Sequence, residues 1–177
     1  LVNVAKNSFL IGGGRENIIE NNIVVNSARV AMQYDDRNRD GYINDGWAWH
    51  HVLPHGIAYM WTTLNAVPYT EGVWSERYPR LAQLKTDEST DVNDPDHPIN
   101  PSYSVVKNNV SITPSGDMFD IADSVYTFSE IEDFAQYATA EDAGWDAESF
   151  TLSADSPVFT DLPEFEAIPV EKIGRKK

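Results

Sequence analysis

The chain is 177 residues long and carries 13 Lys and Arg against 28 Asp and Glu, which gives a net charge of −15 with neutral histidines. That charge argues against nucleic acid or an anionic membrane as a partner, because both need a positive protein surface. Hydrophobic residues make up 41% of the chain, too many for a disordered protein, yet they form no run of about 18 residues that could span a bilayer. The absence of Cys excludes disulfides and thiolate-bound metal.

Residues 1–34 consist of brief apolar runs separated by Gly and Asn, a pattern that predicts short β-strands. Within them, residues 18–25 share a pattern with residues 105–112: two apolar residues, a charged residue, Asn-Asn, and apolar residues at alternate positions. Asn tolerates the left-handed conformation of a tight corner, and its amide can hydrogen-bond to an equivalent Asn in the next layer. The repeat therefore predicts an all-β chain, a short right-handed parallel β-helix.

A polar loop is expected over residues 35–46, and it is the strongest candidate for a cation site. Counted from Asp36, the loop places Asn38 third, Asp40 fifth and Gly41 sixth, as in the first half of an EF-hand calcium loop. The twelfth position is Trp47, where such loops have a bidentate Glu. Asp36, Asn38 and Asp40 are thus candidate Ca²⁺ ligands, and the alternative is a solvated turn in which the arginines pair locally.

Asp35 and Asp36 follow an apolar strand and are also candidate catalytic carboxylates. Glycoside hydrolysis uses two such groups, one to donate a proton and one to act as base or nucleophile. Adjacent strand residues point to opposite faces, so a second carboxylate such as Glu20 or Asp45 would be required. The competing interpretation is ion pairing of these carboxylates with Arg15 or Arg37.

Residues 36–97 interrupt the strand pattern and are interpreted as a partly helical insertion. Apolar spacing predicts a helix at about 56–66, Pro79 is expected to begin a second, and residues 86–98 read as a polar surface loop. Arg37, Trp47 and His50 are candidate substrate contacts. The aromatic residues suit either sugar stacking or, more simply, a small core for the insertion. The aromatic set comprises Trp47, Trp49, Trp61, Tyr69, Trp74 and Tyr78.

Strands are expected again at about 103–112 and 117–128. Ser129-Glu130-Ile131-Glu132 fits a capping box that would open a helix to about Tyr137. Pro157, Pro163 and Pro169 predict an extended tail over residues 150–173. The resulting organisation is a single domain with coils at 1–35 and 98–128, an insertion at 36–97, and a capping helix and tail at 129–177.

Several blocks of residues together resemble the C-terminal part of bacterial secreted right-handed parallel β-helix proteins related to pectate lyases and glycoside hydrolases. The blocks are residues 12–23, 67–69, 74–81, 152–159 and 168–174. The resemblance implies a carbohydrate-active protein, a glycoside hydrolase or polysaccharide lyase, that meets a polysaccharide or oligosaccharide in a secreted or periplasmic location. The alternative is a non-catalytic sugar-binding module, or a structural module that associates with a second copy of itself.

Overall fold

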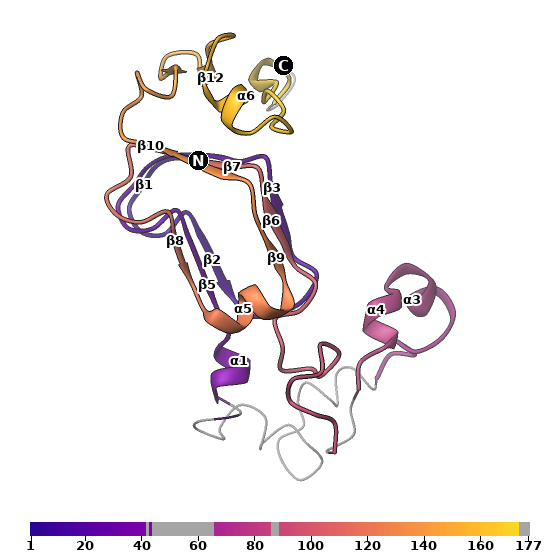
Figure 1. Cartoon of the computed structure of the whole chain (residues 1–177). Coiled ribbons are helices and arrows are strands. Elements are labelled where there is room, and N and C mark those ends of the chain that lie inside the picture. The colour runs from indigo at the N-terminus through magenta and orange to yellow at the C-terminus, as the bar shows by residue number, and fades with distance from the viewer. Residues whose placement is uncertain (42, 44–65, 86–88, 174–177) are drawn as a thin grey trace.

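The computed structural model describes residues 1–41, 43, 66–85 and 89–173. Within them, the chain visits three parallel sheets in turn, and each new strand pairs with one from the preceding layer (Figure 1). The first sheet has the order β1-β4-β7-β10, the second β2-β5-β8 and the third β3-β6-β9. The strand bounds are β1 Val2–Val4, β2 Phe9–Gly12, β3 Ile18–Glu20, β4 Ile23–Ser27, β5 Met32–Asp35, β6 Val105–Lys107, β7 Asn109–Ile112, β8 Phe119–Ile121, β9 Glu130–Ile131 and β10 Phe134–Tyr137.

The repeated sequence pattern lies in register in the structure. Ile18 pairs with Val105 and Ile23 with Val110, so residues 18–25 and 105–112 stack on each other. Asn21 and Asn108 both adopt the left-handed conformation, with φ of 57° and 50°. The next residues link the layers, since Asn22 Nδ2 donates to Asn109 Oδ1 over 3.0 Å. The predicted left-handed Asn corners are confirmed, whereas the amide pairing occurs between the residues that follow the corners, Asn22 and Asn109.

Among the described residues, the first sheet is covered on both faces. Ile23 and Val25 pack outward against residues of the C-terminal segment, whereas Val24 faces the interior with Ala31 and Met118. A second interior cluster lies between the other two sheets and contains Met32, Tyr34, Val106 and Val125. The outer face of β3-β6-β9 consequently stays open to solvent, with Ile18 70% exposed.

Helices connect and flank the sheets. They are α1 (Arg37–Asp40), α3 (Gly72–Arg77), α4 (Pro79–Ala82), α5 (Asp123–Phe128), α6 (Val158–Asp161) and the 3₁₀ turn η2 (Val170–Lys172), and a small antiparallel pair is formed by β11 (Trp145–Asp146) and β12 (Thr151–Leu152). None of the described helices is long and apolar enough to cross a membrane. Figure 1 shows α3 and α4 beyond one end of β3-β6-β9 and the C-terminal segment beyond the other.

The prediction of an all-β chain, a short right-handed parallel β-helix, is wrong. Of the described residues, 20% are helical and 27% lie in strands, and they form several small parallel sheets plus helices with no closed solenoid. One cause is visible, because the segment expected as a strand at 117–128 becomes β8 followed by α5.

The expected helix at 129–137 is also wrong. Glu130 and Ile131 form β9 on the edge of β6, and Phe134–Tyr137 form β10 on the edge of β7. Backbone pairing to two open sheet edges outweighs the local capping signal. The helix beginning at Pro79 is confirmed as α4. The tail is less extended than expected because it includes α6 and η2. The helix predicted at 56–66 falls outside the described residues, apart from residue 66, which lies in a turn.

Candidate functional site

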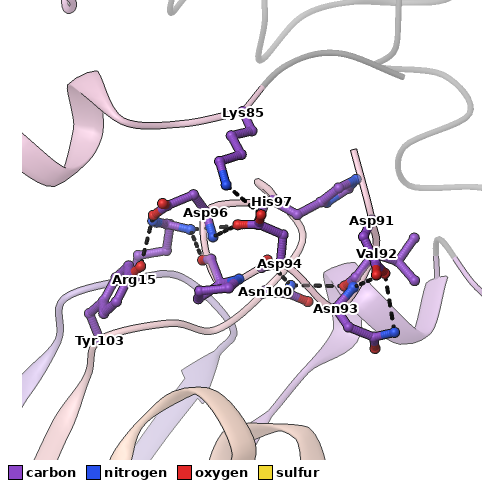
Figure 2. Close-up of polar contacts among 11 residues, drawn as sticks. Arg15, Lys85, Asp91, Val92, Asn93, Asp94, Asp96, His97, Asn100 and Tyr103 are labelled. Carbon is purple, nitrogen blue, oxygen red and sulfur yellow. Dashed lines mark hydrogen bonds and ion pairs between the residues drawn. The ribbon is translucent and has the colours of Figure 1, made fainter. Parts of the chain in front are cut away.

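The acidic segment from Asp91 to Tyr103 is a structural latch rather than an open site. Figure 2 shows its carboxylates turned toward partners within the chain. Asp96 Oδ1 accepts hydrogen bonds from Arg15 Nη2 at 3.2 Å and from the Tyr103 hydroxyl at 2.8 Å. Asp94 pairs with Lys85. Asp91 Oδ1 accepts from the Asn93 backbone at 2.9 Å. These contacts fix the latch against the start of the chain and against α4.

The predicted catalytic carboxylates lie at the end of β5, and both are engaged within the chain. Arg37 donates to both oxygens of Asp35, at 2.9 and 2.6 Å. Asp36 Oδ2 accepts a hydrogen bond from Ser124 Oγ, at the start of α5, over 2.6 Å. Arg37, proposed as a substrate contact, is thus paired with Asp35 in the structure. This geometry resembles the local pairing alternative more than a catalytic pair.

The three candidate Ca²⁺ ligands lie around the short helix α1 rather than in an open loop. Gly41 continues the right-handed turn with φ of −61°, instead of making the sharp turn that an EF-hand loop requires. Residues two apart on a helix do not face each other, so Asn38 points away from Asp36 and Asp40. Among the described residues, no group of three or more His, Asp or Glu could hold a metal ion.

The other two candidate substrate contacts, Trp47 and His50, lie outside the described residues. Part of the aromatic set is described. Trp74 and Tyr78 lie on and beside α3 with ring centroids 5.9 Å apart, and they are 37% and 48% exposed.

The open outer face of β3-β6-β9 brings together charged residues that the sequence separates widely. Alternation along each strand turns Ile19, Val106 and Ile131 toward the interior cluster. The flanking residues therefore point outward. Glu20 pairs in register with Lys107, and the Glu132 backbone N–H donates to Val106 O, which places Glu132 on the other side of Lys107. The result is a row of Glu, Lys and Glu across three neighbouring strands.

One end of this face opens into a groove of about 340 Å³, here named the tyrosine groove. Its central ring, Tyr103, has the Arg80 guanidinium 4.4 Å and the Arg15 guanidinium 5.2 Å from its centroid. Val105 and Phe128 supply apolar surface, and hydroxyl side chains line the edge. The lining residues are Arg80, Tyr103, Ser104, Val105, Thr127, Phe128, Ser129 and Glu130.

The other end holds a groove of about 250 Å³, here named the glutamate groove, lined by Glu20, Asn21, Lys107, Asn108, Glu164 and Glu166. Its second wall comes from the C-terminal segment, and Asn21 holds that wall in place. Asn21 Nδ2 donates to Glu166 O at 2.9 Å, and Glu166 N donates to Asn21 Oδ1 at 2.7 Å. Phe165, between the two wall glutamates, is buried in the core.

Glu130 and Glu132 form a carboxyl pair between the two grooves. Both side chains are exposed and leave β9 on its outward face. Hydrogen bonding with Glu130, reinforced by charge repulsion, raises the pKa of Glu132 above its ordinary value, and Lys107 partly offsets that rise. Such a pair retains one proton at a higher pH than a lone carboxylate does, because two adjacent negative charges repel each other.

The sequence analysis assigned Glu130 and Glu132 to a helix cap and so missed this site. A signal was present at the ends of β3, β6 and β9, where a charged residue precedes a left-handed residue in Glu20-Asn21, Lys107-Asn108 and Glu132-Asp133. The third occurrence, Glu132-Asp133, has Asp in place of Asn and lacks the following Asn, so the sequence pattern did not reveal it as a repeat.

Comparisons with protein-family models, curated proteins and solved structures gave no match to this chain. The family resemblance drawn from residues 12–23 and 152–159 stays a prediction.

Proposed function

We propose that this chain is carbohydrate-active and binds an oligosaccharide along the outer face of β3-β6-β9. The observation that carries the proposal is the Glu130–Glu132 carboxyl pair, which lies between two grooves on an open sheet face. Carboxylates, a lysine, hydroxyls and a small apolar floor are the groups that suit a sugar, with its many hydroxyls and its apolar ring faces.

The same face has the groups needed for glycoside hydrolysis. Glu132, whose pKa is raised by the neighbouring Glu130, is the general acid that protonates the leaving glycosidic oxygen. Glu20, two strands away, is the base that takes a proton from the water attacking the anomeric carbon. Two strand spacings separate the backbones by about 9 to 10 Å, close to the roughly 6.5–9.5 Å between the carboxyl groups of inverting enzymes. Lys107 lies between them and donates to substrate hydroxyls.

Sugar binding without catalysis is the second candidate, and one observation favours it. Both Glu130 and Glu132 are exposed to water, whereas general acids in hydrolases are usually set in a partly desolvated pocket. An exposed pair suits hydrogen bonding to sugar hydroxyls even where no bond is cleaved.

Turnover measurements on a panel of defined oligosaccharides separate these candidates. For hydrolysis, Glu132→Gln and Glu20→Gln should each reduce kcat by about 10²- to 10⁴-fold, because each removes a proton-transfer group. Asp35→Asn is the matched control and should leave kcat unchanged. Loss of turnover in Asp35→Asn with normal turnover in Glu132→Gln would move the site to the end of β5. Binding without turnover in the unaltered chain would support the second candidate.

We further propose a secreted or periplasmic location, where polysaccharides are met, and we do not expect nucleic acid or membrane as a partner. The net charge of −15 supports that expectation. Association with a second copy stays a proposal for the open edges of β1, β2 and β3, and light scattering at increasing concentration tests it.

A further inference from the structure

We propose that the glutamate groove recognises the free amino group of an amino sugar, such as a glucosamine residue, within the oligosaccharide. This inference rests on the proposed function and names its substrate class. Three glutamates and one lysine line the groove, so its charge is strongly negative. None of the ion pairs among the described residues involves Glu20, Glu164 or Glu166. A ligand ammonium would supply the cation that these carboxylates lack.

Asn108 gives a second and independent indication of a ligand. Its residue is only 6% exposed and lines the glutamate groove, yet its side-chain amide has no hydrogen-bond partner among the described residues. The equivalent amides behave differently: Asn21 binds the Glu166 backbone, and Asn109 donates to Ile19 O and Lys107 O. The Asn108 amide therefore keeps hydrogen-bonding capacity that a sugar hydroxyl in the groove would use.

The backbone that carries the wall glutamates is held in position. Glu164 and Glu166 flank Phe165, which is anchored in the hydrophobic core, and the Glu166 backbone is held by Asn21 on the opposite wall. The described residues include no group of three or more His, Asp or Glu that could hold a metal ion. Carboxylates together with an amide suit an ammonium group and hydroxyls carried on a pyranose ring.

The negative charge of the glutamate groove also predicts which oligosaccharides bind more tightly. Oligosaccharides of uronic acids would bring carboxylates toward Glu20, Glu164 and Glu166 and would be repelled. Neutral oligosaccharides would bind without the ionic contribution. N-acetylation of glucosamine removes the positive charge while keeping the ring and linkage, so it provides a matched ligand.

Calorimetric titration with three tetrasaccharides tests the proposal: β-1,4-linked glucosamine, its fully N-acetylated form, and β-1,4-linked glucose. At about pH 6, the glucosamine tetramer should bind most tightly, and its advantage should shrink as salt screens the charges. Glu164→Gln and Glu166→Gln should each weaken it about two- to fivefold, as expected for partly exposed ion pairs.

Glu148→Gln is the matched control, because it removes the same charge from an exposed position that does not line the groove. Glu166→Gln leaves the backbone contacts with Asn21 intact, and thermal unfolding confirms that each variant folds. If the glucose or N-acetylated tetramer binds as tightly as the glucosamine tetramer, the inference is overturned while the proposed function stands. If none of the three tetramers binds the unaltered chain, the proposed function fails with it.

Discussion

At the scale of single residues, positions with a left-handed backbone recur in register from layer to layer. Asn3 in β1, Asn26 in β4 and Thr113 after β7 occupy equivalent positions, with φ between 51° and 56°. Asn tolerates this conformation, whereas the β-branched Thr113 is an uncommon residue for it. Asn26 also donates from Nδ2 to Asn3 Oδ1 over 2.7 Å, so one residue type supplies both the backbone conformation and a link to the next layer. Most other L-residues pay about 1–2 kcal/mol for this conformation.

We expect Asn26→Val to lower the free energy of unfolding by about 1–2 kcal/mol relative to Asn26→Gly, because Gly adopts the left-handed backbone without strain. Both variants lose the amide link to Asn3, so the difference in their free energies of unfolding measures the cost of the left-handed backbone alone. Denaturant unfolding of the two variants measures it. Equal stability of the Val and Gly forms would contradict the assignment of strain to this corner.

His97 is the residue through which the latch responds to pH. It is 3% exposed, and its Nδ1 accepts a hydrogen bond from the Ile99 backbone at 3.3 Å. Burial, and to a lesser degree the nearby Arg39 charge, lowers the pKa of His97 below its ordinary value of 6.5. The folded protein thus favours the neutral ring, so its contribution to stability is complete above that value and is lost as the pH falls.

The unaltered chain should therefore lose stability more steeply than His97→Asn between roughly pH 7 and pH 5. Asn keeps a side-chain acceptor for the Ile99 N–H but does not titrate. Chemical unfolding at several pH values gives the two slopes. The histidines at positions 50, 51 and 55 are common to both proteins, so the difference in slope reports His97 alone. Parallel curves would show that the latch does not sense protonation.

At the scale of elements, the C-terminal segment is held to the sheets by a few specific contacts. Tyr137 at the end of β10 donates its hydroxyl proton to Asp161 Oδ2 in α6 at 2.6 Å. Burial and this bond raise the pKa of Tyr137 above its ordinary range. Val158 and Leu162, within and next to α6, are buried in the same core as Val110 and Ile112. This packing also positions the wall of the glutamate groove.

Removal of the hydroxyl in Tyr137→Phe should destabilise the attachment of α6 by about 0.5–1.5 kcal/mol, the usual net value of one hydrogen bond. Hydrogen exchange should accelerate for the amides of α6 while those of β4 and β7 keep their protection. Tyr126→Phe, at a residue 51% exposed, serves as the control. Faster exchange across all sheets in Tyr137→Phe would show that α6 does not open independently.

The elements also show which structural features the sequence patterns predicted correctly and which they did not. The Asn-Asn repeat predicted both the left-handed corners and the register of residues 18–25 on 105–112, because those features depend on local conformation and a period of two. The helix predicted at 129–137 failed because open edges on β6 and β7 were available for pairing, and a local capping signal carries no information about distant strands. The Glu130–Glu132 pair was missed for the same reason.

At the scale of the whole molecule, the negative charge is distributed between two roles. In the latch, carboxylates such as Asp96 are neutralised within the chain, by Arg15 in this case. In the glutamate groove, Glu20, Glu164 and Glu166 take part in none of the ion pairs among the described residues, although Lys107 also lines the groove. Composition predicted only the total charge, since the pairing of each carboxylate depends on which distant segment the fold brings beside it.

The central claim is that an oligosaccharide binds the outer face of β3-β6-β9, and backbone amide chemical-shift mapping tests it most directly. Titration of the labelled chain with the glucosamine tetramer should shift the amides of Lys107, Asn108, Glu130 and Glu132 together, with saturation at a common ligand concentration. The amides of Asp35 and Asp36 should stay unchanged. Shifts confined to the end of β5, or no shifts at saturating ligand, would contradict the account.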